Sequence, residues 1–379
     1  MNTKRAPKVR FKGFTDAWEL RKFESIAARA SSISADPTLP RVEYEDIISG
    51  IGLLNKDVKL KGISKPGIVF NQGDILYGKL RPYLHNWFLP SFSGLAVGDF
   101  WVLQPKDADS SFLFRLIQGQ QFDDVANQSI GTKMPRADWN LVSKTLFFVP
   151  TSIDEQALIG RYFRSIDNLI TLHQRKLDKM KDLKKAFLNL IFSQKLRFYG
   201  FTDSWELRNL DDEVRFYNGL TYTPSDIVEN DGTLVLRSSN VQNGEIVTDD
   251  NVYVRSEVVS SENVQVGDIT VVVRNGSKAL IGKHAKIREN MYSTVIGAFM
   301  TGIRSEHSSF INALLSTQSF DSEIKKNMGA TINQITGGMF KRMKFFFPEN
   351  AEQEIIGQCF DSIDNLITLR QNKIDSLKE

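Results

Sequence analysis

The sequence predicts an α+β protein in which two globular domains, related by a pseudo-twofold axis, are joined by long antiparallel coiled-coil-like helices. Three features predict this fold. Two segments each occur twice, one of them spaces its apolar residues as a long amphipathic helix does, and short β-rich runs fill the stretches between them. The repeated segments therefore mark two similar halves of the chain.

The first repeat is the sequence SIDNLITL, which occurs at residues 165–172 and again at residues 362–369. The similarity extends beyond these positions, because residues 163–181 and 360–378 are identical at 13 of 19 positions. A match of this length indicates that part of the chain has been duplicated.

The second repeat is RFKGFTDAWELR at residues 10–21, which returns as RFYGFTDSWELR at residues 197–208 with 10 of 12 positions identical. Both repeats occur in the same order, so the chain is an internal duplication. We therefore expect four segments: a first globular domain with the conserved N-terminal segment at 1–152, a first conserved spacer helix at 153–197, a second globular domain at 198–349, and a second, shorter spacer helix at 350–379.

A long helix is expected after each globular domain. Thr151 and Ser152 are N-cap candidates for the first helix, and Asn350 is the candidate for the second. The first helix is expected from about Ile153 to about Ser193, because apolar residues recur over this range at helical spacing.

The apolar residues of both helices follow the spacing of a coiled-coil seam. The expected seam residues are Ile159, Ile166, Leu169, Met180, Leu183 and Phe187 in the first helix and Ile363, Leu366 and Ile374 in the second. A helix this long and amphipathic buries its stripe against another element, and its repeated twin is the nearest candidate. Antiparallel packing is therefore expected, and a plain linker between two domains is the alternative.

The two stretches between the repeats indicate mixed α and β structure. Five runs, DFWVLQP, KTLFFVP, TLVLRSSNV, DITVVVRNG and MKFFFP, are rich in β-forming residues and bounded by turn residues. The stretches differ in sequence but share landmarks, since GDILYGKLRPYL at 73–84 lies where GDITVVVRNGSKALIGK lies at 267–283, and YEDIISGIG falls in the region matched by LRSSNVQNG. We therefore expect the repeated frame to have the same function in both halves and the inserts to have related but different functions.

The composition is ordinary for a globular protein, with 41% hydrophobic and 25% charged residues. No apolar run approaches the roughly 20 residues of a membrane span, and the basic N-terminus lacks the apolar core of a secretory signal. The single cysteine, Cys359, cannot form an internal disulfide. We therefore expect a cytoplasmic protein without a membrane partner, whose net charge of +3 permits a polyanionic partner.

The sequence shows no catalytic motif. The four histidines, at positions 85, 173, 284 and 307, lack the spacing of a zinc site. The stretch GSKALIGKH departs from a phosphate-binding loop, which needs Ser or Thr where His284 stands, so it is expected to be a turn between strands. A G-x-S-x-G elbow, a dinucleotide-binding glycine triplet and an Asn-Pro-Pro methyl-transfer motif are also missing. We therefore expect no metal, no cofactor and no enzymatic activity.

Basic and amide side chains on glycine- or proline-marked loops are the remaining candidates for function. Arg and Lys can neutralise phosphates or bind guanine, and Asn and Gln can pair with adenine. The candidate DNA-binding residues are Lys79, Arg81, Lys133 and Arg136 in the first half and Arg237, Asn240, Arg274, Asn275, Lys278, Asn333 and Gln334 in the second. Each of them taken singly is also compatible with a solvated loop side chain or a surface ion pair.

The ordered set of motifs resembles the specificity subunit of a type I restriction-modification system. The set comprises GFTDxWE, a variable block with GDILYGKLRP or GDITVVVRNGS, a strand that ends in Pro, Glu-Gln, IDNLITL and a long helix, all repeated over essentially the whole chain. The sequence departs from this pattern at the second helix, which stops at Glu379, before the position that matches the end of the first.

The resemblance implies that each variable block is a target recognition domain that reads one half of a bipartite site in double-stranded DNA. It also implies that the helices form the spacer and dock two modification (methyltransferase) subunits, which restriction subunits then join. Methyl transfer and ATP-driven cleavage would belong to those partners. The alternatives are a non-catalytic scaffold whose paired domains bind proteins and, with less support, an unorthodox DNA methyltransferase. Salt-dependent DNA binding distinguishes a DNA reader from a scaffold, and binding of S-adenosylmethionine would indicate the enzyme.

Overall fold

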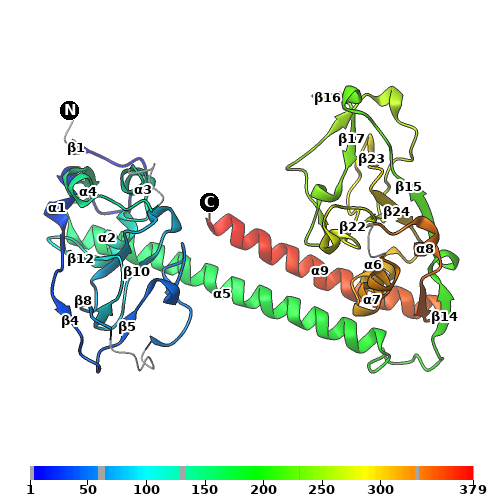
Figure 1. Cartoon of the computed structure of the whole chain (residues 1–379), viewed down its shortest axis with the longest axis horizontal. Coiled ribbons are helices and arrows are strands. Elements are labelled where there is room, and N and C mark those ends of the chain that lie inside the picture. The colour runs from blue at the N-terminus through cyan, green and yellow to red at the C-terminus, as the bar shows by residue number, and fades with distance from the viewer. Residues whose placement is uncertain (1–3, 59–64, 129–133, 230, 329–332, 379) are drawn as a thin grey trace. The chain divides into compact units, whose positions relative to one another are not determined.

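The computed structural model describes residues 4–58, 65–128, 134–229, 231–328 and 333–378 and divides into two compact units (Figure 1). Unit 1 comprises residues 1–171 and unit 2 residues 172–379. The boundary falls inside helix α5 (Ile153–Phe192), so this helix contributes to both units. Each unit contains helices and strands, which confirms the α+β class. The expected borders at 152 and 197, which set the helix apart, remain a prediction.

The described residues of unit 1 form three sheets, a hairpin and four short helices, besides the first part of α5. Its sheets have the strand orders β1–β2–β13, β10–β9–β12–β3 and β4–β8–β11–β5. The strands are β1 (Lys4–Arg5), β2 (Trp18–Lys22), β3 (Ala27–Arg29), β4 (Ile33–Ser34), β5 (Arg41–Val42), β8 (Gly67–Phe70), β9 (Ile75–Gly78), β10 (Trp87–Phe88), β11 (Gly94–Ala96), β12 (Phe100–Pro105) and β13 (Leu146–Val149), with the hairpin β6 (Ile47–Ile48) and β7 (Leu53–Leu54). The helices are α1 (Phe23–Ile26), α2 (Ser110–Leu116), α3 (Gln120–Ala126) and α4 (Trp139–Lys144).

Unit 2 repeats this plan with its own set of strands. Its sheets have the orders β14–β25, β15–β24–β21–β22 and β16–β20–β17–β23, and β18 pairs with β19 as a hairpin. The strands are β14 (Glu206–Asn209), β15 (Arg215–Asn218), β16 (Ile227–Val228), β17 (Thr233–Leu236), β18 (Val241–Gln242), β19 (Glu245–Ile246), β20 (Tyr253–Val254), β21 (Ile269–Val272), β22 (His284–Lys286), β23 (Thr294–Ile296), β24 (Met300–Arg304) and β25 (Lys344–Phe347). The helices besides α5 are α6 (Ser308–Leu315), α7 (Gln318–Asn327), α8 (Gly337–Lys341) and α9 (Asn350–Lys378).

One sheet is the same in both units. The order β10–β9–β12–β3 corresponds strand by strand to β22–β21–β24–β15, and all these pairs are antiparallel. Gly73 and Gly267, which open the matched landmarks, have φ of 90° and 92°, a conformation that glycine adopts without steric cost. The predicted correspondence of these landmarks is therefore confirmed, and each of the five predicted β-rich runs contains a strand.

The other four-stranded sheet differs between the units. Both versions contain one parallel pair, β5 with β11 and β17 with β23. In unit 1 the next strand, β8, pairs with β11, whereas in unit 2 the next strand, β20, pairs with β17. The inserts thus differ in the sheets β4–β8–β11–β5 and β16–β20–β17–β23 and in the loops, whereas the sheets β10–β9–β12–β3 and β22–β21–β24–β15 have the same strand order.

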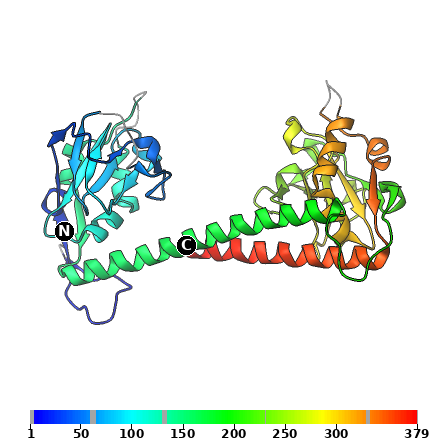
Figure 2. The ribbon, with the colours of Figure 1, turned by 90° about the horizontal axis from the view of Figure 1, so that it is seen from below.

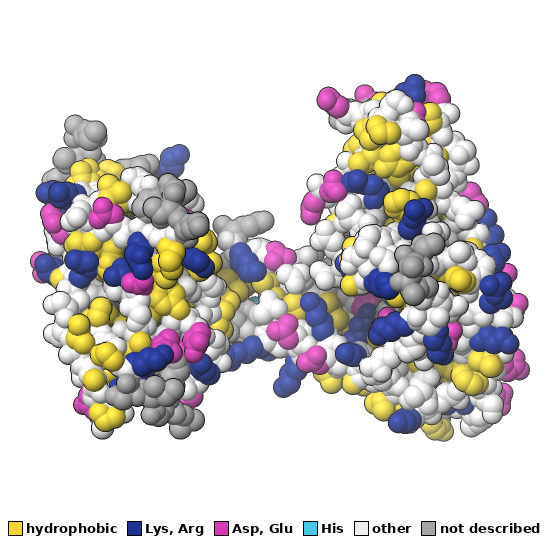
Figure 3. Space-filling view, viewed as in Figure 1, with side chains coloured by type: hydrophobic (Ala, Val, Ile, Leu, Met, Phe, Trp, Pro, Cys, Tyr) yellow, Lys and Arg dark blue, Asp and Glu magenta, His cyan; other side chains and the backbone are white. Residues whose placement is uncertain are grey.

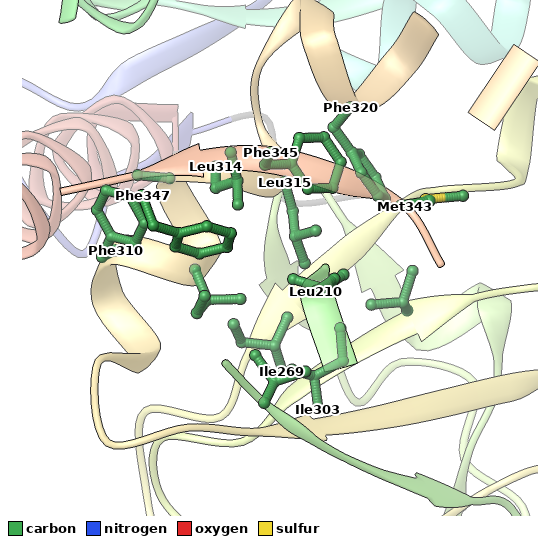
Figure 4. Close-up of a cluster of buried hydrophobic side chains, with 14 of the residues drawn as sticks. Leu210, Ile269, Ile303, Phe310, Leu314, Leu315, Phe320, Met343, Phe345 and Phe347 are labelled. Carbon is green, nitrogen blue, oxygen red and sulfur yellow. The ribbon is translucent and has the colours of Figure 1, made fainter. Parts of the chain in front are cut away.

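Helix α6 forms the centre of the unit 2 core. Its residues from Phe310 to Leu315 are all buried, which agrees with its nearly continuous apolar sequence. Figure 4 shows side chains of α6 gathered with those of the neighbouring strands, among them Phe310, Leu314, Leu315, Ile269, Ile303, Phe345 and Phe347. The corresponding core of unit 1 is rich in aromatic residues, including Phe23, Tyr77, Trp101, Phe112 and Phe122.

The second part of α5 and helix α9 lie side by side within unit 2 (Figures 1 and 2). Lys184 Nζ lies 2.5 Å from Asp364 Oδ1, and the guanidinium of Arg370 lies 3.0 Å from His173 Nδ1. Nearer the end of α5, the Phe192 ring lies 6.4 Å from that of Phe360. As the residue numbers along α5 rise from 173 to 192, those of their contacts on α9 fall from 370 to 360. The antiparallel packing predicted for the helices is therefore confirmed here.

The buried residues of these helices differ from the expected seam. Leu177, Leu188 and Ile191 of α5 and Ile356, Phe360 and Ile374 of α9 are buried. Of the expected seam residues, Ile374 is buried, Ile159, Ile166, Met180 and Ile363 are partly buried, and Leu169, Leu183, Phe187 and Leu366 are exposed. The apolar stripe is wider than one contact line, so spacing alone could not tell which of its edges packs. The expectation for the four exposed residues is therefore corrected.

The helix starts agree with the sequence to within one residue. Ser152 Oγ accepts a hydrogen bond from the Glu155 amide at 3.3 Å, as an N-cap does. Asn350 is the first residue of α9 instead of its cap, because the Glu349 carbonyl already accepts a hydrogen bond from the Gln353 amide.

None of the helices in the described part of the chain combines the length and the apolar character of a membrane span.

Candidate nucleic-acid interface

The repeated N-terminal motif of unit 1 is fixed to the start of α5 by a buried carboxylate. Arg10 donates two hydrogen bonds to Glu155, from Nε at 2.6 Å and from Nη2 at 2.7 Å, and the indole of Trp18 donates a third at 3.2 Å. The Glu155 side chain is 1% exposed, so this bidentate pair is shielded from water. The hydrogen bond to Glu155 raises the pKa of Arg10.

Unit 2 repeats this arrangement. Arg197 donates to Glu352 from Nε at 3.0 Å and from Nη2 at 2.6 Å, and Trp205 donates to the same carboxylate at 3.0 Å. The Glu352 side chain is also 1% exposed. We call each set of three residues a frame clamp. The clamps explain why Arg, Trp and Glu recur in both halves: they join the segment at the start of β2 to the first turn of α5, and the segment before β14 to the first turn of α9.

The glutamine beside each clamp carboxylate completes the helix start. Gln156 Nε2 donates to the carbonyl of Pro150 at 2.8 Å, and Gln353 Nε2 donates to that of Pro348 at 3.0 Å. The sequence marked the Glu-Gln pair and the Trp motif as landmarks but gave no signal that they meet.

Three candidate residues of the first half, Lys79, Arg81 and Arg136, come together in what we call the first loop cluster: the turn η1 (Tyr44–Asp46) and residues 79–85, 99 and 134–138. Leu80 and Arg136 form an isolated antiparallel bridge, and the Arg81 amide donates to the Pro135 carbonyl at 2.8 Å. The Tyr44 hydroxyl accepts from the Leu80 amide at 3.1 Å and donates to the Asp99 carbonyl at 2.5 Å. Burial raises the pKa of Tyr44, so this hydroxyl stays protonated and keeps its donor role.

The basic side chains of this cluster are not equally available. Arg136 Nη2 lies 2.9 Å and Lys79 Nζ 3.6 Å from the carboxylate of Asp99. Arg81 is exposed, has a left-handed backbone with φ of 50°, and has no side-chain ion pair or hydrogen bond to a described residue. Its guanidinium is therefore free to meet an anion. Lys133 lies outside the described residues.

Six of the seven candidate residues of the second half, all but Arg237, lie in a matching second loop cluster: the turn η6 (Ser238–Asn240) and residues 273–280, 299 and 333–338. Arg274 and Gln334 form an isolated antiparallel bridge at the place of the Leu80–Arg136 bridge. Asn333 Nδ2 donates to the Gly276 carbonyl at 2.8 Å, and Asn275 Nδ2 donates to Ser238 Oγ at 3.0 Å. The two amide side chains thus tie the loops together.

Arg274 and Lys278 are the exposed basic groups of the second cluster. The Arg274 guanidinium lies over the Phe299 ring, 4.9 Å from its centroid, and the ring is 53% exposed. Lys278, at the start of the turn η8 (Lys278–Leu280) between β21 and β22, is exposed without an ion pair to a described residue. This turn confirms the interpretation of GSKALIGKH.

Two residues of the second half that were predicted to bind DNA, Asn240 and Arg237, have partners within the chain instead. Asn240 is fully buried, where its Oδ1 accepts from the Arg237 amide at 2.9 Å and its Nδ2 donates to the Val247 carbonyl at 3.0 Å. It therefore shapes the loop and presents no group to a ligand, which corrects the expectation. Arg237 is paired with Asp250 at 2.8 Å.

The charge of the surface is mixed. On the face drawn in Figure 3, Lys and Arg side chains are scattered among hydrophobic and acidic ones in each unit. Among the described residues, no group of three or more His, Cys, Asp or Glu side chains could hold a metal ion.

The two loop clusters contain guanidinium, ammonium and amide groups that can recognise a ligand.

Comparison with known proteins agrees with this geometry. Residues 202–379 match the family model described as type I restriction modification DNA specificity domain. The type I restriction enzyme EcoKI specificity subunit of Escherichia coli (strain K12) is 27% identical over 169 residues, which are 42% of this chain and 36% of that protein. The MjaVIII specificity subunit of Methanocaldococcus jannaschii is 23% identical over 348 residues, 86% of this chain and 80% of that protein.

A solved structure shares the fold over the whole length. The crystal structure of the type I restriction-modification S subunit from M. genitalium covers 99% of this chain and 96% of its own, with a TM-score of 0.64 and 13% identity. The duplicated α+β frame with long helices is thus a fold that this chain shares with a solved S subunit. Residues 202–379 thus match the type I restriction modification DNA specificity domain, and the chain is similar to specificity subunits of type I restriction-modification systems, as its motifs predicted.

Proposed function

We propose that this chain is the non-catalytic subunit that recognises a bipartite target in double-stranded DNA, with unit 1 reading one half-site and unit 2 the other. The observation that carries the proposal is the pair of loop clusters, which occupy matched positions on a repeated frame but present different side chains. Arginine and amide groups on such loops suit the base edges of the major groove. Matched positions with different side chains suit two half-sites of different sequence.

The long helices support the second part of the proposal, in which they set the spacing of the half-sites and dock two modification subunits, with restriction subunits joining the complex. Apolar side chains along α5 and α9 are exposed, namely Tyr162, Phe163, Leu169, Leu172, Leu183, Phe187, Leu190, Leu366 and Leu369. Exposed apolar side chains in such number on long helices favour a protein partner. They would equally serve a scaffold, the alternative function, which predicts no sequence-specific binding to DNA.

The proposal is tested by mapping the methylation that this chain directs together with its modification subunit. A bipartite methylated sequence, and binding to it that weakens steeply with salt, are the expected results. Methylation without sequence preference, or the same affinity for all duplexes, would contradict DNA reading and favour the scaffold.

Exchange of one insert is expected to change one half-site. Replacement of residues 22–150 by the corresponding block of a related subunit removes the first loop cluster but keeps Arg10, Trp18 and Glu155, so the unit 1 clamp can still form. Methylation mapping should then show a new first half-site and an unchanged second one. The reciprocal exchange of residues 209–348 is the control, and a change in both half-sites from either exchange would show that the units do not read independently.

Substitution Arg274→Ala is expected to weaken binding to the target by about 1–3 kcal/mol and to reduce the sequence preference at one base pair of the second half-site. The reason is that the Arg274 side chain is exposed beside the bridge, where a guanidinium can donate hydrogen bonds to a guanine. Fluorescence titrations with duplexes varied at each position measure both effects. Lys278→Ala is the comparison: a lysine that binds phosphate should weaken all duplexes alike. Unchanged affinity and preference in Arg274→Ala would remove this residue from the interface.

A further inference from the structure

Residues 99 and 299 occupy the same place in the two units. Asp99 directly precedes β12 and Phe299 directly precedes β24, the matched central strands whose first residues pair with Gly78 and Val272. The Asp99 carbonyl accepts from the Lys79 amide at 2.9 Å, and the Phe299 carbonyl accepts from the Val273 amide at 3.0 Å. Both backbones are therefore held rigidly against the loop that carries the bridge.

The bridge in each unit contains one arginine, on opposite sides. In unit 1 the arginine is Arg136 and it faces Leu80, whereas in unit 2 it is Arg274 and it faces Gln334. The residue at 99 or 299 contacts this arginine in both cases. Asp99 accepts from Nε at 3.3 Å and from Nη2 at 2.9 Å of Arg136, and the Phe299 ring lies beneath the guanidinium of Arg274 at 4.9 Å.

We propose that residues 99 and 299 are positioning residues that determine half-site specificity, because each fixes the arginine of its own bridge toward the DNA. This inference rests on the proposed function. A flexible arginine loses side-chain entropy when it binds a base, whereas one already held in place loses less and discriminates better between bases. The carboxylate in unit 1 and the ring in unit 2 are two chemical solutions to this same requirement.

The two solutions differ in charge. Asp99 lies against both Arg136 and Lys79, so its carboxylate offsets one of their two positive charges. Phe299 holds Arg274 through its π face and leaves the charge intact. We therefore expect removal of the Asp99 charge to strengthen binding that does not depend on sequence, and loss of the Phe299 ring to leave the salt dependence unchanged.

The test uses the full chain and duplexes that carry the mapped target with single base-pair changes. Asp99→Asn should lower discrimination at one base pair of the first half-site about tenfold, bind random-sequence DNA more tightly, and make the dependence of log K on log salt steeper by about one. The second half-site should be read as before. Phe299→Ala should lower discrimination about tenfold in the second half-site alone, with the salt dependence of the wild type.

Glu24→Gln is the matched control. Glu24 is 50% exposed on α1 and pairs with Lys22 at 3.6 Å, the distance that separates Lys79 from Asp99. This variant removes the same charge from the same unit but touches no bridge. If Asp99→Asn and Glu24→Gln affect binding alike, the effect is one of net charge and the positioning role is overturned.

Arg136→Lys provides an independent reading. It keeps the charge but loses the bidentate geometry, so it should relax the same base pair as Asp99→Asn without changing the salt dependence. The double variant should be no less discriminating than either single one, since both changes disable one reading group. Wild-type discrimination in both single variants, with unchanged circular dichroism, would overturn the inference while leaving DNA reading in place. Lack of discrimination by the wild type would instead refute the proposed function, and this inference with it.

Discussion

Replacement of Glu352 by alanine is expected to lower the free energy of unfolding of unit 2 by about 2–3 kcal/mol. The carboxylate is buried and accepts three hydrogen bonds, two from Arg197 and one from Trp205. Without it, a guanidinium that is 20% exposed and an indole nitrogen lose their common partner. The cost is placed below that of a fully buried ion pair because Arg197 can still reach water.

Urea unfolding measures the change in the free energy of unfolding. Hydrogen exchange is measured separately in peptides that cover residues 198–209 and 345–356, the two sides of the unit 2 clamp. Faster exchange on both sides is expected, because Glu352 joins them. Glu354→Ala is the control: Glu354 lies in the same turn of α9 but its side chain is 55% exposed, so a change within about 0.5 kcal/mol is expected. Equal stability of Glu352→Ala and Glu354→Ala would show that the clamp does not hold the helix to the unit.

The two long helices and five of the strands could be predicted from the sequence because their signals are local. Helix α5 begins at Ile153 as expected and ends one residue before Ser193, since its apolar spacing and its Ser152 cap both lie within the segment itself. In the matched sheet, strands β12 and β21 were marked by β-rich runs closed by turn residues. The duplication then extended each local conclusion to the other half of the chain.

The contacts that position side chains could not be predicted, because they join residues far apart in the sequence. Arg10 and Glu155 are separated by 145 residues and Arg197 and Glu352 by 155, and neither pair has a spacing that would indicate a contact. The same holds for Asn240, whose polar side chain suggested an exposed reader but is used to cap its own turn. Whether a polar loop residue is free depends on its partners, and these come from the fold.

The seam of the long helices shows the same limit at shorter range. Leu183 was among the expected seam residues and Leu177 was not, yet Leu177 is fully buried and Leu183 is 55% exposed. The contact line is chosen by α9, which Lys184 meets through Asp364. The exposed part of the stripe is the surface proposed above for a protein partner, so the misplacement of the seam bears on that proposal.

An insertion of four residues after Lys176 is expected to lengthen the spacer between the half-sites while both half-site sequences are kept. The site lies just before buried Leu177, so the residues from Leu177 onward keep their contacts with α9. Four residues add about 6 Å of helix and about 400° of rotation, a net turn of roughly 40°. One base pair adds about 3.4 Å and roughly 35°. The displaced unit can therefore face the groove again when the spacer grows by one base pair, or at most two.

An insertion of two residues at the same place is the matched comparison. It leaves a rotation of about 200°, which turns one reading surface away from the DNA, so specific binding should be lost. Methylation mapping of both variants with the modification subunit decides between them, and circular dichroism shows whether each is folded. If the four-residue variant remained active on the original spacer, the helix would not set the distance between half-sites, and that distance would have to come from the docked modification subunits.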